Sequence, residues 1–141
     1  MNKYSVILLF VFCASFFTGC KKYYDGPLIS FRSKEKRLIN TWHLESYLIN
    51  NVDKTVCYAN IAYTDYTIVF NENKTVTEEY YDVSDSLRHH VYTWHFDDNK
   101  ERIILEPGIR SLLIWRLTSK ELWAIKEEVT SDVHQIRLVS E

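Results

Sequence analysis

Apolar and polar residues alternate along most of the chain after Asn40. Runs of β-branched and aromatic residues with a period of two are separated by short polar turns, a pattern typical of antiparallel strands joined by hairpins. The pattern predicts strands over residues 41–49, 63–71, 74–81, 91–97, 102–106, 111–118, 121–127 and 133–140. Because the turns are short, we expect consecutive strands to be neighbours in space.

The segment before these strands predicts one short helix, over residues 30–40. Ser30 can cap its N-terminus, and Phe31 and Leu38 form its packing face. Short strands in meander order can close on themselves, with the last strand beside the first, and so remove their exposed edges. The predicted fold is therefore all-β: an eight-stranded antiparallel up-and-down meander barrel preceded by one short N-terminal helix.

Alternation within each strand also predicts which side chains point into the barrel. The expected inward residues are Trp42, Leu44, Leu48, Tyr66, Ile68, Phe70, Tyr92, Trp94, Phe96, Ile103, Leu105, Leu117, Leu122, Ile136 and Leu138. On the sixth strand either Leu113 or Ile114 points inward, and a bulge near Trp115 would place Ile114 and Leu117 on one side.

Glu78 and His134 are polar residues that share the inward parity of their apolar neighbours. A buried carboxylate or imidazole must be paired or must shift its pKa. Three interpretations stay open: a polar handle for the head group of a ligand, two groups that meet water at an open barrel end, or a parity that is wrong by one residue.

The N-terminus has the organisation of a secretion signal. Lys3 precedes an apolar run over residues 6–12, and small residues follow up to Cys20. The apolar stretch covers about 16 residues, fewer than the roughly 20 that span a bilayer, so we expect cleavage rather than anchoring by a helix. Residues 17–20 resemble a bacterial lipobox, although Phe17 stands where leucine is usual.

This assignment predicts three segments: a lipoprotein signal peptide over residues 1–19, a lipidated Cys20 with its tether over residues 20–29, and the barrel domain over residues 30–141. Acyl chains on Cys20 would hold the protein on a membrane without a spanning helix. Lys21 stands where an aspartate usually retains such lipoproteins in the inner membrane. We therefore expect the outer membrane, with the periplasmic face favoured over the cell surface.

Composition and charge narrow the range of functions. The 141 residues allow one domain, and 17 Lys and Arg against 19 Asp and Glu give a net charge of −2, which argues against nucleic acid as a partner. Three glycines are too few for a phosphate-binding loop. The five histidines do not converge on one face, and no Gly-x-Ser-x-Gly motif is present. We expect no enzyme activity, no metal and no cofactor.

Five segments carry a resemblance to a known family: residues 20–27, 30–44, 66–70, 92–94 and 117–122. In these segments the chain resembles the lipocalin-like lipoproteins of Bacteroidetes, small outer-membrane proteins that are mostly of unknown function. The resemblance covers nearly the whole chain and implies both the barrel and the lipid anchor. Its motifs occupy core and turn positions, so it implies little about chemistry.

Two functions are compatible with these features. In the first, the barrel binds a small apolar or amphipathic molecule, and the candidate contacts are Trp42, Tyr66, Phe70, Glu78, Trp94 and His134. In the second, a filled barrel is a non-catalytic scaffold that meets an envelope protein or glycan through its tyrosine-rich surface or residues 82–90. The volume left inside separates them, because ligand pockets begin at roughly 300 Å³.

Overall fold

The computed structural model describes residues 32–56, 64–82, 84–108, 110–127 and 131–141. The predicted signal peptide, Cys20 and its tether lie outside these residues. In the described part of the chain, nine strands form one antiparallel sheet in the order β2-β1-β3-β4-β5-β6-β7-β8-β9. They are β1 (Thr41–Ile49), β2 (Val52–Asp53), β3 (Thr64–Phe70), β4 (Thr75–Tyr81), β5 (Leu87–Phe96), β6 (Arg102–Glu106), β7 (Arg110–Leu117), β8 (Glu121–Glu127) and β9 (His134–Ser140).

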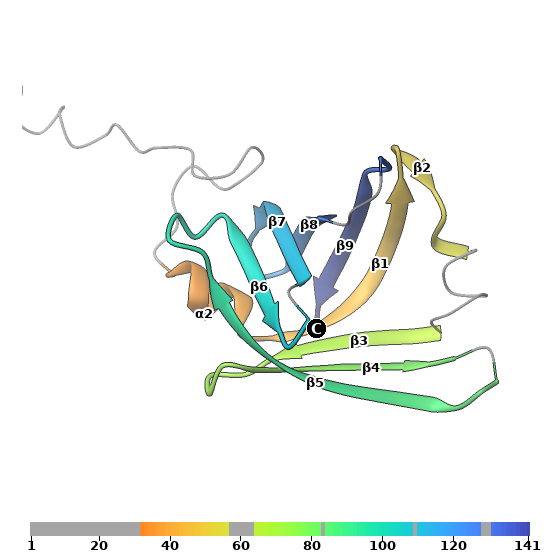
Figure 1. Cartoon of the computed structure of the whole chain (residues 1–141), viewed down its shortest axis with the longest axis horizontal. Coiled ribbons are helices and arrows are strands. Elements are labelled where there is room, and N and C mark those ends of the chain that lie inside the picture. The colour runs from red at the N-terminus through yellow and green to blue at the C-terminus, as the bar shows by residue number, and fades with distance from the viewer. Residues whose placement is uncertain (1–31, 57–63, 83, 109, 128–130) are drawn as a thin grey trace, which may run out of the picture.

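Pairing between β1 and β9 closes the sheet into a barrel, as Figure 1 shows. Eight of the strands form the barrel wall in meander order, which confirms the predicted eight-stranded up-and-down architecture. The ninth, β2, was not expected. It pairs with the end of β1 through Asn50 and Asn51, both at positive φ, and two residues are too few to produce an alternating pattern.

One short helix, α2 (Lys34–Leu38), precedes β1. Its N-cap is Ser33 rather than the predicted Ser30, which lies outside the described residues. The Ser33 hydroxyl accepts a 3.2 Å hydrogen bond from the backbone N–H of Lys36, the usual geometry of a serine cap. The helix ends at Leu38, which is fully buried. The predicted helix is confirmed, but it is shorter than residues 30–40.

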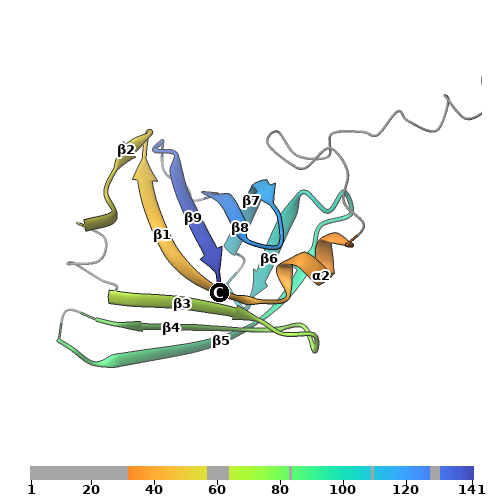
Figure 2. The same cartoon turned by 180° about the vertical axis from the view of Figure 1, so that it is seen from behind.

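The helix α2 covers one end of the barrel, as both views show (Figures 1 and 2). Arg37 Nη1 donates a 2.7 Å hydrogen bond to the carbonyl oxygen of Leu117, at the end of β7. Trp42 Nε1 donates a 2.9 Å hydrogen bond to the carbonyl oxygen of Leu38. We call this end of the barrel the closed end, and the opposite end, where β2 lies, the open end.

The core is densest at the closed end. Trp42, Phe70 and Trp94 are almost completely buried there, and the rings of Phe70 and Trp94 meet edge to face with 5.7 Å between their centroids. Such an arrangement is favourable beyond its buried area. The buried inward positions predicted on β3, β6, β8 and β9 are confirmed by this core.

Bulges decide the inward parity on two strands. On β7 the register shifts between Ile114 and Arg116, so Ile114 is buried, as the predicted bulge near Trp115 requires. On β1 the register shifts between Leu44 and Ser46, and Tyr47 is buried in place of the predicted Leu48. The prediction for Leu48 is wrong because one extra residue in a strand moves every later side chain to the other face.

Candidate functional site

A cavity of about 380 Å³ lies inside the barrel and reaches its open end. Its apolar wall includes Ile68, Leu105, Leu112, Leu122, Ala124 and Ile136. The volume exceeds the roughly 300 Å³ at which pockets for small molecules begin. The barrel therefore has room for a small ligand. Core side chains fill its closed end, and the cavity lies toward its open end.

Glu78 is the buried carboxylate of this cavity, with 7% of the residue exposed. The hydroxyl of Tyr66 on β3 donates a 2.5 Å hydrogen bond to its Oε1. Arg110 Nη2, at the start of β7, donates to its Oε2 at 3.3 Å. The strands β4 and β7 are separated in the sheet by β5 and β6, so this ion pair joins strands that are not neighbours. Both carboxylate oxygens have partners, as a buried charge requires.

Arg110 also contacts an aromatic ring. Its guanidinium carbon lies 4.3 Å from the centroid of the Tyr92 ring, within the range of a cation–π interaction. Burial lowers the pKa of Arg110, but the charge of Glu78, its hydrogen bond and the nearby phenol groups of Tyr92 and Tyr66 together outweigh burial, so the pKa lies above its ordinary value. Burial is also the main reason why the pKa of Tyr92 is raised. At neutral pH the site thus contains a charged guanidinium and a neutral phenol.

A row of nearly parallel rings lies beside this ion pair, across β3, β4 and β5. Tyr66 and Tyr80 stack with 6.3 Å between centroids, Tyr80 and His90 with 5.8 Å, and His90 and Tyr92 with 6.2 Å. The Tyr80 hydroxyl lies 3.3 Å from His90 Nε2. This row fixes the rings at its two ends, Tyr66 and Tyr92, which contact Glu78 and Arg110.

The structure brings together two of the six predicted contacts, since Tyr66 and Glu78 both line the cavity and are hydrogen-bonded to each other. Trp42, Phe70 and Trp94 pack in the core at the closed end. His134 lies at the open end, where its Nδ1 is 2.5 Å from the hydroxyl of Tyr47. The six candidates therefore occupy three different levels of the barrel.

Sequence reasoning did not single out Arg110 and Lys126, two cationic residues that line the cavity. The sequence nevertheless contains a signal for both residues, which is their position in the strand alternation. Arg110 has the parity of Leu112 on β7, and Lys126 has the parity of Ala124 on β8, so alternation assigns both to the inward face. The predicted sixth strand began one residue too late, at Ser111, and so left Arg110 in the preceding turn.

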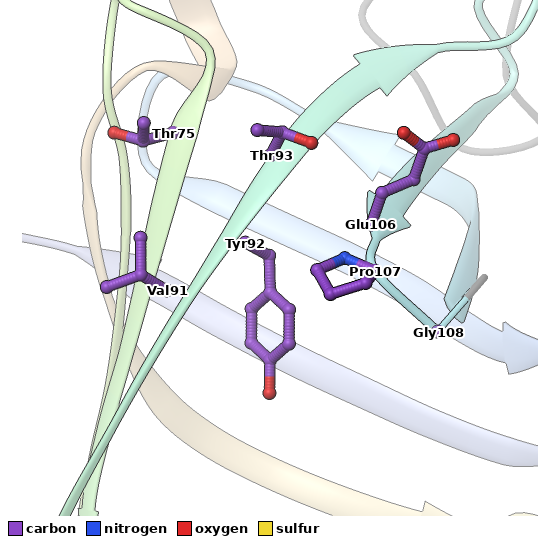
Figure 3. A pocket seen from close by; sticks show the side chains of 7 residues that line it. All are labelled: Thr75, Val91, Tyr92, Thr93, Glu106, Pro107 and Gly108. Atoms are coloured by element: carbon purple, nitrogen blue, oxygen red, sulfur yellow. The ribbon is translucent and has the colours of Figure 1, made fainter.

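A second hollow, of about 400 Å³, lies on the outer side of the wall (Figure 3). It forms because β5 pairs with β6 only through Thr93–Phe96, while the preceding part of β5 pairs with β4 alone among the described strands. The turn from Glu106 to Gly108 borders it, and Gly108 has a φ of +105° that favours glycine. This groove is shallow, whereas the inner cavity is deeper and contains the buried carboxylate of Glu78. The inner cavity is the candidate site.

No three His, Cys, Asp or Glu side chains among the described residues are grouped so that they could hold a metal ion. None of the described helices is long and apolar enough to cross a membrane.

Comparisons with known proteins identify the fold. No family model matches the sequence, and no curated protein matches it. Among solved structures, a lipocalin-like protein from Bacteroides uniformis superposes with a TM-score of 0.55 and 12% identity, over 74% of this chain and 99% of that chain. Bovine odorant binding protein with its natural ligand superposes with a TM-score of 0.53 and 15% identity, over 80% of this chain and 77% of that chain. The complex of the same bovine protein with undecanal has a TM-score of 0.53 and 15% identity, over 80% of this chain and 76% of that chain. The fold is lipocalin-like.

Proposed function

We propose that this protein binds one small, largely apolar molecule in the cavity of its barrel. The observation that carries the proposal is the space of about 380 Å³ inside the barrel, with an apolar wall and one buried carboxylate, Glu78. A mostly apolar pocket with a few convergent polar groups is the usual form of a small-molecule site. The complex of bovine odorant binding protein with undecanal, on a similar barrel, lends support by analogy.

The same observation weighs against the scaffold alternative, which requires a filled barrel. Side chains fill only the closed end, where Trp42, Phe70 and Trp94 pack. In our proposal these three residues form the floor on which a bound molecule rests. Tyr66 and Glu78 contact the molecule from the wall, and His134 contacts it from the rim. Binding rather than catalysis is the proposed role.

We further propose that the barrel is tethered to a membrane through acylated Cys20, after removal of residues 1–19. Residues 20–29 then form the tether. Lys21 favours the outer membrane, and the lack of an acidic cluster after Lys22 favours its periplasmic face. Cys20→Ala should release the protein from the membrane fraction into the soluble fraction, because acyl chains supply the binding energy. Unchanged sedimentation with membranes would contradict the anchor while leaving the ligand proposal intact.

A substitution that fills the cavity tests the ligand proposal. Ala124 is buried and lines the cavity, so Ala124→Phe should occupy the space and weaken binding of the uncharged dye Nile red by about tenfold or more. Val91→Phe adds the same ring system on the exposed outer side of β5, where the native residue is 54% exposed, and should leave the affinity unchanged. A thermal unfolding curve of each variant checks that it folds.

Native mass spectrometry of the protein purified from its own envelope would give an independent result. A stoichiometric small-molecule adduct, lost in Ala124→Phe and kept in Val91→Phe, would support the proposal. Equal Nile red affinity in the wild type and in Ala124→Phe would show that the cavity is not the binding site.

A further inference from the structure

The charged residues around the cavity differ in the partners that they have within the chain. Four charged residues line it: Glu78, Arg110, Lys126 and Glu127. Glu127 is held on the outer side, because Arg102 Nε donates to its two carboxylate oxygens at 3.1 and 3.0 Å and the Ser111 hydroxyl donates to one of them at 2.6 Å. The other three are Glu78 and Arg110, which pair with each other, and Lys126, whose Nζ lies 5.6 Å from the centroid of the Tyr47 ring.

Both carboxylate oxygens of Glu78 already accept hydrogen bonds from this chain. Tyr66 and Arg110 each donate to one of its oxygens, and its side chain is only 10% exposed. Arg110 has five N–H donors, of which Nη2 donates to Glu78, and its side chain is 45% exposed. The guanidinium therefore retains donor capacity beyond this ion pair, on a side chain that faces both the cavity and water.

Arg110 and Lys126 lie on neighbouring strands and both line the cavity. Lys126 lies directly opposite Leu112 in the pairing of β7 with β8, and Arg110 lies two residues before Leu112 on the same face of β7. Such diagonal neighbours are within reach of each other's long side chains. Their charged ends lie by different walls, with the guanidinium over the Tyr92 ring of β5 and the ammonium 5.6 Å from the centroid of the Tyr47 ring of β1, so the two cations border the open end from two sides.

We infer that the cavity selects an amphiphile with an anionic head group, a carboxylate held by Arg110 and Lys126 at the open end, with its apolar chain on the wall formed by Ile68, Leu105 and Ile136. This inference rests on the proposed function and adds the chemical class of the ligand. A cationic head group would meet two like charges and compete with Arg110 for Glu78. A neutral head group can accept a hydrogen bond from these cations but brings no opposite charge to pair with them.

Three ligands with the same chain and different head groups test the inference. Decanoate, decanol and decylamine are titrated into the purified full chain at neutral pH, and displacement of Nile red is measured. We expect decanoate to bind about tenfold or more tighter than decanol, since hydrogen bonds to charged groups contribute on that scale. Decylamine should bind more weakly than decanol.

Four variants assign the preference to residues. Lys126→Met and Arg110→Met should each reduce the advantage of decanoate over decanol by about fivefold or more. Glu78→Gln keeps the hydrogen-bonding shape and removes the internal counter-charge, so it should increase the affinity for decanoate, a gain that a purely structural role of Glu78 would not produce. Arg116→Met on the same strand is the control, because Arg116 pairs with Glu121 and does not line the cavity.

The outcomes separate this inference from the proposed function. Equal binding of decanoate and decanol, or tighter binding of decylamine, would overturn the anionic preference while the cavity remained a binding site. A decanoate preference that survives both Arg110→Met and Lys126→Met would also overturn it. Failure of Nile red and of all three ligands to bind would refute the proposed function itself.

Discussion

Arg37 and Leu117 are 80 residues apart in the sequence and are joined by a 2.7 Å hydrogen bond from the guanidinium Nη1 to the backbone carbonyl oxygen. Arg37 is a buried arginine, and the carbonyl belongs to the last residue of β7. This bond attaches α2 to the barrel wall, so the cover of the closed end depends on one cationic side chain as well as on apolar packing.

Arg37→Met should lower the free energy of unfolding by about 1.5–3 kcal/mol, because it removes a charged donor and leaves the Leu117 carbonyl without it. Urea unfolding followed by tryptophan fluorescence measures the change. Lys36→Met, at an exposed position of the same helix, should change stability by less than about 0.5 kcal/mol. Equal stability of the two variants would show that the bond does not hold the helix.

Trp42 should be the most sensitive core position, because it is fully buried and its indole N–H donates to Leu38. Trp42→Ala should cost about 3–5 kcal/mol of stability. The matched control is Trp123→Ala, since Trp123 is only half-buried, with the guanidinium carbons of Arg116 and Arg137 at 5.1 and 4.6 Å from its ring. A loss within about 1 kcal/mol for Trp42→Ala would contradict its assignment to the core.

Glu127 supplies a pH-dependent contribution to stability. Hydrogen bonds from Arg102 and then from Ser111 hold the pKa of Glu127 below its ordinary value. A carboxyl whose pKa is lower in the folded state stabilises the fold above its unfolded pKa, about 4.3, and this contribution is lost as the pH falls through the folded value.

Arg102→Met should therefore raise the pKa of Glu127, measured from the pH dependence of its carboxyl carbon signal in NMR. The variant should also lose less stability than the wild type between pH 5 and the acid limit of the fold. Arg88→Met, which disrupts the separate ion pair with Asp82, should leave the titration of Glu127 unchanged. An unchanged pKa in Arg102→Met would exclude this coupling.

Leu112 connects stability to cavity size, because it is buried and lines the cavity. Leu112→Ala should cost about 2–5 kcal/mol in the ligand-free protein. An apolar ligand at a free concentration of 100 times its Kd should raise the free energy of unfolding by about 2.7 kcal/mol, measured as a rise in unfolding temperature. Leu87→Ala, at an exposed position of β5, should change neither the stability of the ligand-free protein nor the stabilisation that the ligand produces. No ligand-dependent recovery in Leu112→Ala would count against binding beside this residue.

Much of the fold could be predicted because alternation is a local signal. The turns around Asn71 and Pro107 separate strands whose apolar faces are regular, and β6 has the predicted bounds, Arg102–Glu106. The exceptions have physical causes. The start of β5, Leu87–His90, is exposed and polar apart from Leu87. It extends the strand only because it pairs with residues 78–81 of β4. No apolar alternation marks such a segment.

The site was less accessible to sequence reasoning. Parity placed Glu78 inside, and the structure shows it buried, but its partner Arg110 is 32 residues away on a strand that is not adjacent. Nothing local specifies that pairing, since it arises from closure of the barrel. The shift from Leu48 to Tyr47 depends on a bulge that leaves no composition signal on β1.

Closure between β1 and β9 has a practical consequence. Trp42 pairs with Ser140, and Glu141 lies beside His43 with 3.2 Å between their side chains, so the described chain both enters the barrel and leaves it at the end covered by α2 (Figure 1). A reporter domain fused after Glu141 would sit far from Arg110 and Lys126. The mouth would stay unobstructed, and uptake of a ligand could be followed in living cells with the fusion in place.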